Sequence, residues 1–500
     1  MFNKVLIANR GEIAVRIAST LQQMGVTSVA VYSDADRSAP HVLSADEAYP
    51  LEGNSAAESY LRGEKIIEIA RRYGVDAIHP GYGFLSENAS FAQACRDAGI
   101  IFIGPSPEGI RALGDKVQAK KAMADAGVPV VPGWSGGDSD GPDRLAKEAK
   151  KIGYPVLLKA AAGGGGKGMR VVAAEKELPA ALETCRREAA AAFGNSRVFV
   201  EKYIAHPRHV EFQIFGDSQG NVVHLFEREC SIQRRHQKIV EETPSPALTP
   251  QLRGRMGDAA VKAAKAIGYA NAGTVEFLVD EAGQFYFLEV NTRLQVEHPV
   301  TEMTLGLDLV ALQLRIAAGE PLPFSQEALR PQGHAIECRI YAEDSARGFL
   351  PSTGVIRAYH PPCGPFIRVD SGVAESTEVS VYYDAMLAKL IVWGRTRDEA
   401  LRRMSWALRR FVVLGVTTNI EFLQKIITHQ EFAAGRTQTD FLVVHDIKAA
   451  SDGPIPNEVY MAAAAASECQ NGRKQKGTGD GRANSVYDDP WQRASAWRGV

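Results

Sequence analysis

The chain has 500 residues, of which 45% are hydrophobic and 23% charged, and its formal net charge is −2. This length predicts about three domains of ordinary globular composition, and the near-zero charge excludes a general basic field for nucleic acid. No apolar run approaches the length of a transmembrane helix, and the six cysteines show no paired spacing, so we expect reduced thiols, a cytoplasmic protein and no membrane contact.

The first 114 residues alternate between strand and helix patterns. We expect strands at 4–8, 28–32, 75–79 and 100–103 and helices at 11–24, 62–73, 87–98 and 106–113. This alternation predicts a doubly wound parallel sheet. Its first turn contains one glycine, Gly11, and no GxGxxG, so a dinucleotide fingerprint is absent. Because a strand begins almost at Met1, we expect no signal or transit peptide.

A Gly-flanked aromatic loop, His79-Pro80-Gly81-Tyr82-Gly83-Phe84, follows the third of these strands. Ligands bind at the carboxyl ends of parallel strands, so Tyr82 is a candidate ligand contact. The alternative is that the two aromatic rings only pack the loop. Ser86 is predicted to cap the next helix.

Residues 115–133 predict a helix and a linker, and strands and helices alternate again from about 154 to 203. The run Gly163–Gly168 carries four consecutive glycines and then Lys167, a composition that lets backbone N–H groups close around a phosphate. It is not a Walker A loop, because Gly168 stands where Ser or Thr is needed. Since strand patterns flank it, we predict a hairpin-like lid, with a plain flexible loop as the alternative. Lys159, which ends an apolar strand, is a candidate phosphate contact.

Antiparallel strands are expected at 209–216 and 222–228, followed by the cationic run 234–238. Surface charge is the usual reading of such a run, but its place after a core strand favours anion binding. A third, β-rich region extends from Gly333 to about Asp384, with helices at 396–410 and 418–428. Arg339 lies on a strand of this region, where a structural ion pair is the simpler explanation.

Two strands, 273–279 and 285–291, predict a hairpin. If Ala282 and Gly283 form a two-residue turn, Glu276 faces Glu289 directly. At about 5 Å and an effective dielectric near 20, the repulsion is roughly 3 kcal/mol. A divalent cation would reverse it, and Mg²⁺ or Mn²⁺ prefers such oxygen ligands, with Asn291 as a third on the same face. A solvated acidic edge is the alternative.

Together these motifs closely resemble biotin carboxylases, which belong to the ATP-grasp superfamily, over residues 1 to about 447. The segments that carry the resemblance are 7–14, 79–88, 163–168, 234–238 and 289–299. It implies a mixed α/β and α+β fold with four regions: a doubly wound N-terminal domain (1–114), an ATP-grasp domain (115–330) whose mobile lid spans about 134–203, a mixed β-rich C-terminal domain (331–447), and a linker or tail (448–500).

The resemblance implies that ATP phosphorylates bicarbonate to carboxyphosphate, which yields the CO₂ that the N1′ atom of biotin captures. The implied ATP contacts are Lys116, Lys159, Gly164, Gly165, Gly166, Lys167, Gly168, Glu201, Lys202, Ile204, His209, Gln233 and His236. The implied ligands of two Mg²⁺ or Mn²⁺ ions are Glu276, Glu289 and Asn291. The implied bicarbonate and biotin contacts are Lys238, Arg293, Gln295, Val296, Glu297, Arg339 and Tyr82. Of these, Lys238, Arg293, Glu297 and Arg339 are the catalytic set: Glu297 resembles the general base, and Arg339 the residue that stabilises the biotin enolate.

The Ala-Met-Lys-Met motif that carries biotin in this family is absent from the sequence. We therefore expect biotin on a separate carrier protein or a carrier domain missing from this chain, and a carboxyltransferase as a second partner. The tail around Asp489–Trp491 and Ala496–Arg498 resembles α subunits of methylcrotonoyl-type acyl-CoA carboxylases, so we expect part of such a subunit. A free-standing subunit is the competing idea. The family implies a homodimer or a larger carboxylase complex.

Two alternatives remain open from the sequence. Another ATP-grasp carboxylate or carbamoyl ligase would share the Glu276 and Glu289 metal ligands, but it would not be expected to keep segments 79–88 and 234–238 together. A non-catalytic nucleotide-binding subunit would be expected to lack Glu297 or Arg339, and both are present.

Overall fold

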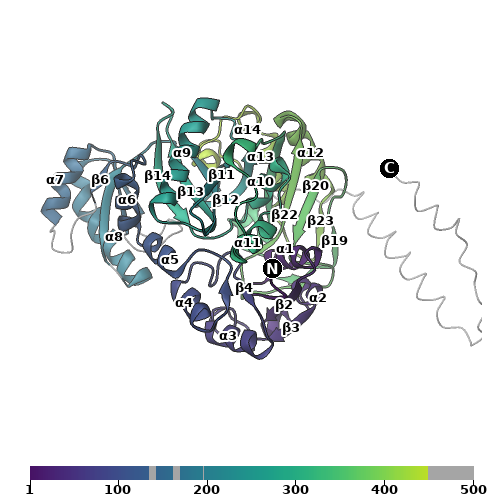
Figure 1. Cartoon of the computed structure of the whole chain (residues 1–500). Helices are drawn as coiled ribbons and strands as arrows, with labels where there is room; N and C mark the ends of the chain where they lie inside the picture. The colour runs from purple at the N-terminus through teal and green to yellow at the C-terminus, as the bar shows by residue number, and fades with distance from the viewer. Residues whose placement is uncertain (135–141, 161–168, 195, 449–500) are drawn as a thin grey trace, which may run out of the picture. The chain divides into compact units, whose positions relative to one another are not determined.

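The computed structural model of the protein describes residues 1–134, 142–160, 169–194 and 196–448 (Figure 1). The predicted Gly163–Gly168 loop and the tail beyond 448 lie outside these residues. The described residues belong to one compact unit, Met1–Ala449. The division of this unit into three regions stays a prediction. None of the described helices combines the length and the apolar character that crossing a bilayer requires.

The N-terminal sheet is parallel, with strand order β3-β2-β1-β4-β5. Its strands are β1 (Lys4–Ile7), β2 (Thr27–Tyr32), β3 (Glu47–Pro50), β4 (Ala77–His79) and β5 (Ile101–Phe102). Its helices are α1 (Gly11–Gln23), α2 (Pro40–Ser44), α3 (Gly63–Arg72), α4 (Ala89–Asp97) and α5 (Pro107–Gly114). The predicted doubly wound parallel sheet is confirmed, whereas β3 and α2 were not predicted.

Alternation along β1 explains why helices cover both faces of this sheet. Val5 and Ile7 pack in the core that holds the apolar side of α1, while Leu6 packs on the other face with residues of α3 and α4. A strand buried on both faces reads as a continuous apolar run, as this one does. Asn88, not Ser86 as predicted, caps α4, because its side chain accepts the N–H of Phe91 at 2.9 Å.

A four-stranded antiparallel sheet, β6-β9-β7-β8, follows. Its strands are β6 (Gly133–Trp134), β7 (Val156–Ala160), β8 (Met169–Val172) and β9 (Val198–Lys202), and α7 (Pro142–Ile152) and α8 (Leu178–Phe193) pack on it. Before it in the chain, α6 (Lys116–Asp125) packs against the hairpin of β13 (Asn271–Val279) and β14 (Phe285–Asn291). Lys159 pairs with Met169 across β7 and β8. The glycine run therefore connects two paired antiparallel strands, as predicted from its flanks.

The largest sheet has eight antiparallel strands in the order β14-β13-β10-β11-β12-β15-β22-β20. They are β10 (Arg208–Gly216), β11 (Val222–Arg234), β12 (Gln237–Thr243), β13 (Asn271–Val279), β14 (Phe285–Asn291), β15 (His334–Tyr341), β20 (Ile367–Ser371) and β22 (Met386–Gly394). Pairing of β12 with β15 continues the sheet across the predicted boundary at 330. The second and third predicted regions therefore share one sheet.

Helices and short strands complete the unit. The helices are α9 (Pro250–Ala266), α10 (His298–Leu305), α11 (Leu309–Ala317), α12 (Arg397–Arg410), α13 (Ile420–Thr428), α14 (Gln430–Ala433) and α15 (Phe441–Val444). The short strands are β16 (Glu343–Asp344), β17 (Leu350–Pro351), β18 (Gly354–Val355), β19 (Ala358–His360), β21 (Glu378–Val379) and β23 (Val412–Leu414). The apolar face of β15 and β22 packs against α12 and α13. The opposite face of these strands carries Glu337, Arg339 and Lys389, because side chains alternate along a strand.

Candidate active site

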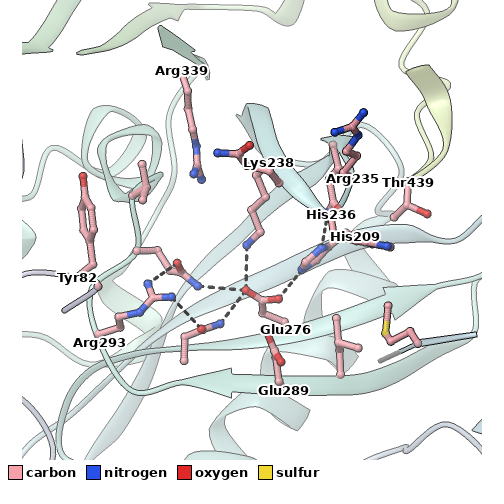
Figure 2. A pocket seen from close by; sticks show the side chains of 18 of the residues that line it. Tyr82, His209, Arg235, His236, Lys238, Glu276, Glu289, Arg293, Arg339 and Thr439 are labelled. Carbon is pink, nitrogen blue, oxygen red and sulfur yellow. Dashed lines mark hydrogen bonds and ion pairs between the residues drawn. The ribbon is translucent and has the colours of Figure 1, made fainter. Parts of the chain in front are cut away.

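A cavity of about 1210 Å³ brings together residues from all three predicted regions (Figure 2). Among the residues that line it are Tyr82, Lys159, Glu201, Lys202, Ile204, His209, Gln233, His236, Lys238, Glu276, Glu289, Asn291, Arg293, Gln295, Val296 and Arg339. With one exception, these are all the predicted site residues whose side chains are described. The exception is Glu297, which is fully buried beneath the lining. The side chain of Lys116 and the residues Gly164–Gly168 lie outside the description.

The β13–β14 hairpin places Glu276 opposite Glu289, as predicted, although its turn is longer than the predicted one. The turn is a three-residue loop, because Asp280 pairs with Gln284 (N to O, 2.9 Å). On its own this loop would shift the register by one. A bulge between Glu276 and Phe277 restores it, so that Leu288 has no partner in the register and the two glutamates still face each other. The predicted two-residue turn is therefore wrong, and the predicted carboxylate pair is right.

Glu276 is almost fully buried and collects four polar partners. Its oxygens accept from Lys238 Nζ at 2.9 Å, Asn291 Nδ2 at 2.8 Å and Gln295 Nε2 at 3.1 Å, and lie 2.7 Å from His209 Nε2 (Figure 2). Burial alone would raise the pKa of Glu276, but Lys238 and His209 outweigh it and hold the pKa well below its usual range. Glu276 is therefore ionised and faces the cavity.

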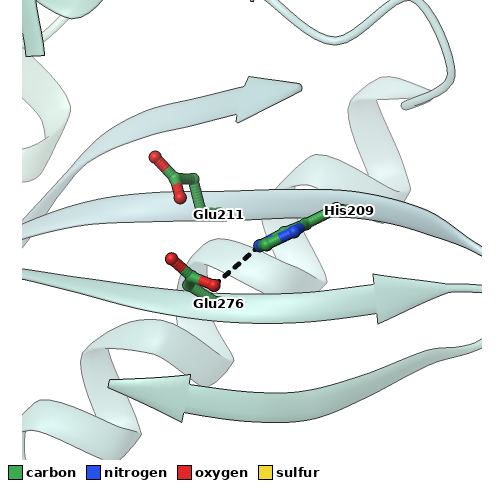
Figure 3. A group of neighbouring side chains, drawn as sticks. All are labelled: His209, Glu211 and Glu276. Carbon is green, nitrogen blue, oxygen red and sulfur yellow. Dashed lines mark ion pairs between the residues drawn. The ribbon is translucent and has the colours of Figure 1, made fainter. Parts of the chain in front are cut away.

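The donor set around Glu276 fits a divalent cation. Glu276, Glu289 and Asn291 supply oxygens from adjacent strands, which is the ligand type that Mg²⁺ prefers. His209, Glu211 and Glu276 also come close enough to share an ion (Figure 3). Glu211, however, is fully buried and does not line the cavity, whereas Glu276, Glu289 and Asn291 all line it. We therefore favour the predicted ligand set over the His209-containing group.

Lys238 stands at the centre of the charged groups. Its Nζ contacts carboxylate oxygens of Glu211 (2.5 Å), Glu276 (2.9 Å) and Glu297 (2.8 Å). Burial would lower the pKa of Lys238, but these three carboxylates raise it well above the usual value. The side chain is therefore a fixed positive charge between the metal-ligand candidates and Glu297.

Glu297 is held between two cations. Its Oε1 accepts from Lys238, and its Oε2 accepts from Arg339 Nη2 at 2.9 Å. Burial would raise the pKa of Glu297, but Lys238, Arg339 and Arg228 together hold it well below its usual range. Glu297 is thus ionised and can accept a proton from a ligand that displaces one of these cations. Arg339 in turn donates from Nε to Glu241 at 2.6 Å.

Arg293 links the site to the N-terminal sheet. Its Nε donates to Glu87 at 3.0 Å, and its Nη atoms donate to Gln295 at 2.8 Å and Asn291 at 3.1 Å. Glu87 belongs to the predicted motif 79–88, and it also accepts the N–H of Thr292. The two motifs that stood far apart in the sequence are therefore joined by a carboxylate that sequence reasoning did not single out.

At the other end of the cavity, Glu201 is bound by two lysines. Lys159 Nζ and Lys120 Nζ each lie 2.6 Å from a different oxygen of Glu201. Lys120 was missed, although it lies one helical turn after Lys116 on α6 and hence on the same face. Its pKa is lowered by burial and by Lys159, in part offset by Glu201. Two lysine side chains, Lys120 and Lys159, therefore lie at this end of the cavity, where an anionic ligand would contact them.

The turn between β11 and β12 also faces this cavity. Arg235 and His236 adopt positive φ values of 50° and 68°, which non-glycine residues rarely do. Both line the cavity, whereas Arg234 pairs with Glu343 and stacks on Phe349. The cationic run 234–238 therefore divides into structural and cavity-lining members, a division that the sequence alone did not reveal.

His79 supports the loop that carries Tyr82. The ring is fully buried, its Nδ1 accepts the N–H of Gly81 at 3.0 Å, and its Nε2 lies 3.2 Å from the amide oxygen of Gln313. Burial lowers the pKa of His79 to about 4. The folded protein therefore excludes the charged ring, and stability is lost as the pH falls below the ordinary value of about 6.5.

We expect His79→Asn to remove this pH dependence. Between pH 7 and pH 5, the free energy of unfolding of the unmodified chain should fall by about 2 kcal/mol more than that of the variant. Urea unfolding at the two pH values measures the difference. Equal losses in both proteins would show that His79 titrates normally in the folded state.

Comparison with known proteins gives three family models in chain order. The model described as biotin carboxylase, N-terminal domain, matches residues 1–110. The model described as carbamoyl-phosphate synthase L chain, ATP binding domain, matches residues 115–325. The model described as biotin carboxylase C-terminal domain matches residues 337–443.

Similar proteins and structures cover most of the chain. The methylcrotonoyl-CoA carboxylase subunit alpha, mitochondrial, of Arabidopsis thaliana is 54% identical over 92% of this chain, which spans only 63% of that protein. Biotin carboxylase 1 of Bacillus subtilis is 51% identical over 89% of this chain and 99% of its own length. The biotin carboxylase domain dimer of Hydrogenobacter thermophilus 2-oxoglutarate carboxylase, solved with MgADP, ADP and bicarbonate, has a TM-score of 0.87 and 49% identity, over 90% of this chain and 100% of that one.

Proposed function

We propose that the chain, which belongs to the biotin carboxylase family, carboxylates biotin on a carrier with ATP and bicarbonate. This is the first half-reaction of an acyl-CoA carboxylase. The observation that carries the proposal is the placement of Glu297 between Lys238 and Arg339, where Lys238 also contacts Glu276, the partner of Glu289 across the hairpin. An acceptor for a proton, donors for a small anion and oxygen ligands for a metal thus adjoin one another, as the reaction requires.

In the first step, a bicarbonate oxygen attacks the γ-phosphorus of ATP, ADP leaves and carboxyphosphate forms. Lys238, Arg293 and the backbone around Val296 would hold the bicarbonate, with Gln295 beside them, and Glu297 would take its proton. Lys116, Lys159, His209, Gln233 and His236 would hold the nucleotide, with Glu201 and the segment Lys202–Ile204 at the adenine. Gly164–Gly168 with Lys167 would close over the phosphates. Mg²⁺ or Mn²⁺, held by Glu276, Glu289 and Asn291, would neutralise phosphate charge.

In the second step, the C–O bond of carboxyphosphate breaks to give CO₂ and phosphate. The phosphate is the strongest base generated in the cavity, and we assign it the proton from N1′ of biotin. Arg339 would stabilise the resulting enolate oxygen in a water-poor site, where such donors are most effective. Tyr82 would contact biotin from the other wall. The nitrogen then attacks CO₂, and carboxybiotin leaves with its carrier.

Phosphate release from ATP tests this function. With bicarbonate and Mg²⁺, the purified chain should release phosphate, and free biotin should accelerate the release. A requirement for an amine would favour another ATP-grasp ligase, which the family model for residues 115–325 alone would also permit. No release at all would favour a non-catalytic nucleotide-binding subunit.

Glu289→Gln is expected to raise the Mg²⁺ or Mn²⁺ concentration needed for half-maximal activity about tenfold or more, because one charged oxygen ligand is replaced by a neutral amide. Metal titration of ATP cleavage measures the effect. Glu281→Gln is the matched control, since Glu281 is an exposed acid in the loop of the same hairpin. Superimposable titrations of the Glu289 variant and the unmodified chain would refute the role of Glu289 as a metal ligand.

The relatives named above support a proposal for the partners. We propose that biotin comes on a carrier protein or domain and that a carboxyltransferase consumes the product. We also propose a homodimer or a larger complex. The cytoplasm is our proposed location.

A further inference from the structure

Lys389 is a fully buried lysine that the proposed steps do not use. It lies on β22, directly opposite Arg339 of β15 on one side and Asp370 of β20 on the other. Two cations opposite each other on neighbouring strands repel, and a buried ammonium is costly unless it is compensated. The surroundings of Lys389 must therefore supply partners, and the identity of those partners indicates its role.

The partners come from three separate parts of the fold. Lys389 Nζ donates to the backbone carbonyl of Val296 at 2.9 Å, lies 3.1 Å from a carboxylate oxygen of Glu12 in the first turn of α1, and lies 3.7 Å from Asp370. Burial would lower the pKa of Lys389, but the nearby carboxylates of Glu12 and Asp370 raise it. The ammonium therefore stays charged where α1, β20 and the segment after β14 meet.

The contact with Val296 completes a set of restraints on one short segment. His298 Nδ1 lies 2.8 Å from the carbonyl oxygen of Gln295, and since that oxygen only accepts, the ring must donate. Lys389 holds the next carbonyl, that of Val296, and Arg339 holds the side chain of Glu297. The peptide planes on both sides of Val296 are therefore fixed by buried donors.

We propose that Lys389 is a positioning residue for bicarbonate, acting through the Val296–Glu297 peptide. It touches no substrate. Its ammonium fixes the backbone that would hold bicarbonate and the direction from which Glu297 reaches it. The inference rests on the proposed function, and it adds that Asp370 and an oxygen acceptor at position 12 keep this ammonium in place. Asp370 is itself held by Arg368 through two contacts of 2.7 Å.

Two variants separate positioning from simple stability. Lys389→Met alone leaves Glu12 without its cation and risks unfolding. The double variant Lys389→Met/Glu12→Gln removes both charges and leaves Asp370 with Arg368. Glu12→Gln alone is the matched control, because it keeps Lys389 and its bond to Val296. It is also mild, since burial raises the pKa of Glu12 to about 7 despite Lys389.

The first readout is the kinetics of ATP cleavage. In the double variant, kcat/KM for bicarbonate should fall about 10- to 100-fold, as expected for loss of a hydrogen bond from a charged donor, while KM for ATP stays within about twofold. Glu12→Gln should leave both constants near those of the unmodified chain. An unchanged KM and kcat for bicarbonate in the folded double variant, or equal losses for both substrates, would overturn the proposal.

The second readout does not depend on activity. Amide hydrogen exchange in the peptide covering residues 294–299 should be faster in the double variant than in Glu12→Gln, because a buried restraint on this backbone is gone. Equal exchange would also overturn the proposal. If the unmodified chain showed no bicarbonate-dependent cleavage while the exchange difference persisted, the proposed function would fail and the structural role of Lys389 would stand.

Discussion

Replacing Glu297 with alanine is expected to lower bicarbonate-dependent ATP cleavage by about 10²–10⁴-fold, the usual contribution of a general base, while nucleotide binding persists. The physical reason is that Glu297 is the buried carboxylate that both Lys238 and Arg339 keep ionised. Lys238 keeps Glu211 and Glu276 as partners in the variant, so its position should survive. Initial rates with saturating ATP and varied bicarbonate measure the loss of ATP cleavage, and a nucleotide-binding titration measures the retained binding.

Glu337→Gln is the matched control for this substitution. Glu337 is another fully buried glutamate, but it lies on β15 and its side-chain oxygens accept no hydrogen bond from Lys238 or Arg339. Burial raises the pKa of Glu337 well above its usual value, so a neutral amide imitates the form that is already present. We expect nearly unchanged rates. Near-normal turnover in Glu297→Ala would remove Glu297 from the role of base.

Replacing Arg339 with alanine is expected to abolish the acceleration by free biotin and to lower turnover by about 10²–10³-fold, the usual loss when one oxyanion donor is removed. Arg339 is the donor that bridges Glu241 and Glu297, at 2.6 and 2.9 Å. Its loss removes the charge assigned to the enolate and also releases Glu297 from its orientation. ATP affinity should change little, because neither carboxylate is among the proposed nucleotide contacts.

Arg397→Lys serves as the control for Arg339→Ala. Arg397 is also an arginine paired with a buried glutamate, Glu242, at 2.7 Å, but it does not line the cavity. Lysine keeps the charge beside Glu242, so the fold and the biotin response should be retained. Stimulation by biotin that survives in Arg339→Ala would contradict the assignment of this residue to the enolate.

Strand and helix patterns predicted four of the five strands of the N-terminal sheet, whereas most candidate site residues came from the family resemblance. The β13–β14 hairpin shows that strand patterns do not determine the length of a turn or the position of a bulge. The predicted two-residue turn was one residue too short, and a bulge beside Glu276 cancelled the error. Bulges depend on packing of the finished sheet, which a local pattern does not encode. The prediction that Glu276 faces Glu289 was therefore right only because the longer loop and the bulge shift the register in opposite directions.

Long-range contacts account for the rest of what the sequence did not reveal. Glu87 reaches Arg293 across more than two hundred positions, and the β12–β15 pairing joins two predicted regions into one sheet. Neither follows from composition or periodicity. Lys120, by contrast, could have been predicted from its helical spacing to Lys116. The buried acids Glu211 and Glu241 were also unforeseen, because each lies in an apolar strand pattern and is explained only by a distant cation.

The most direct test of the central claim is the transfer of label from ¹⁴C-bicarbonate to free biotin. With ATP and Mg²⁺, the purified chain should form acid-labile, ¹⁴C-labelled carboxybiotin, and the label should be lost when ATP is omitted or when Glu297 is replaced by alanine. ATP cleavage without label in biotin, or label that does not depend on ATP, would contradict the account.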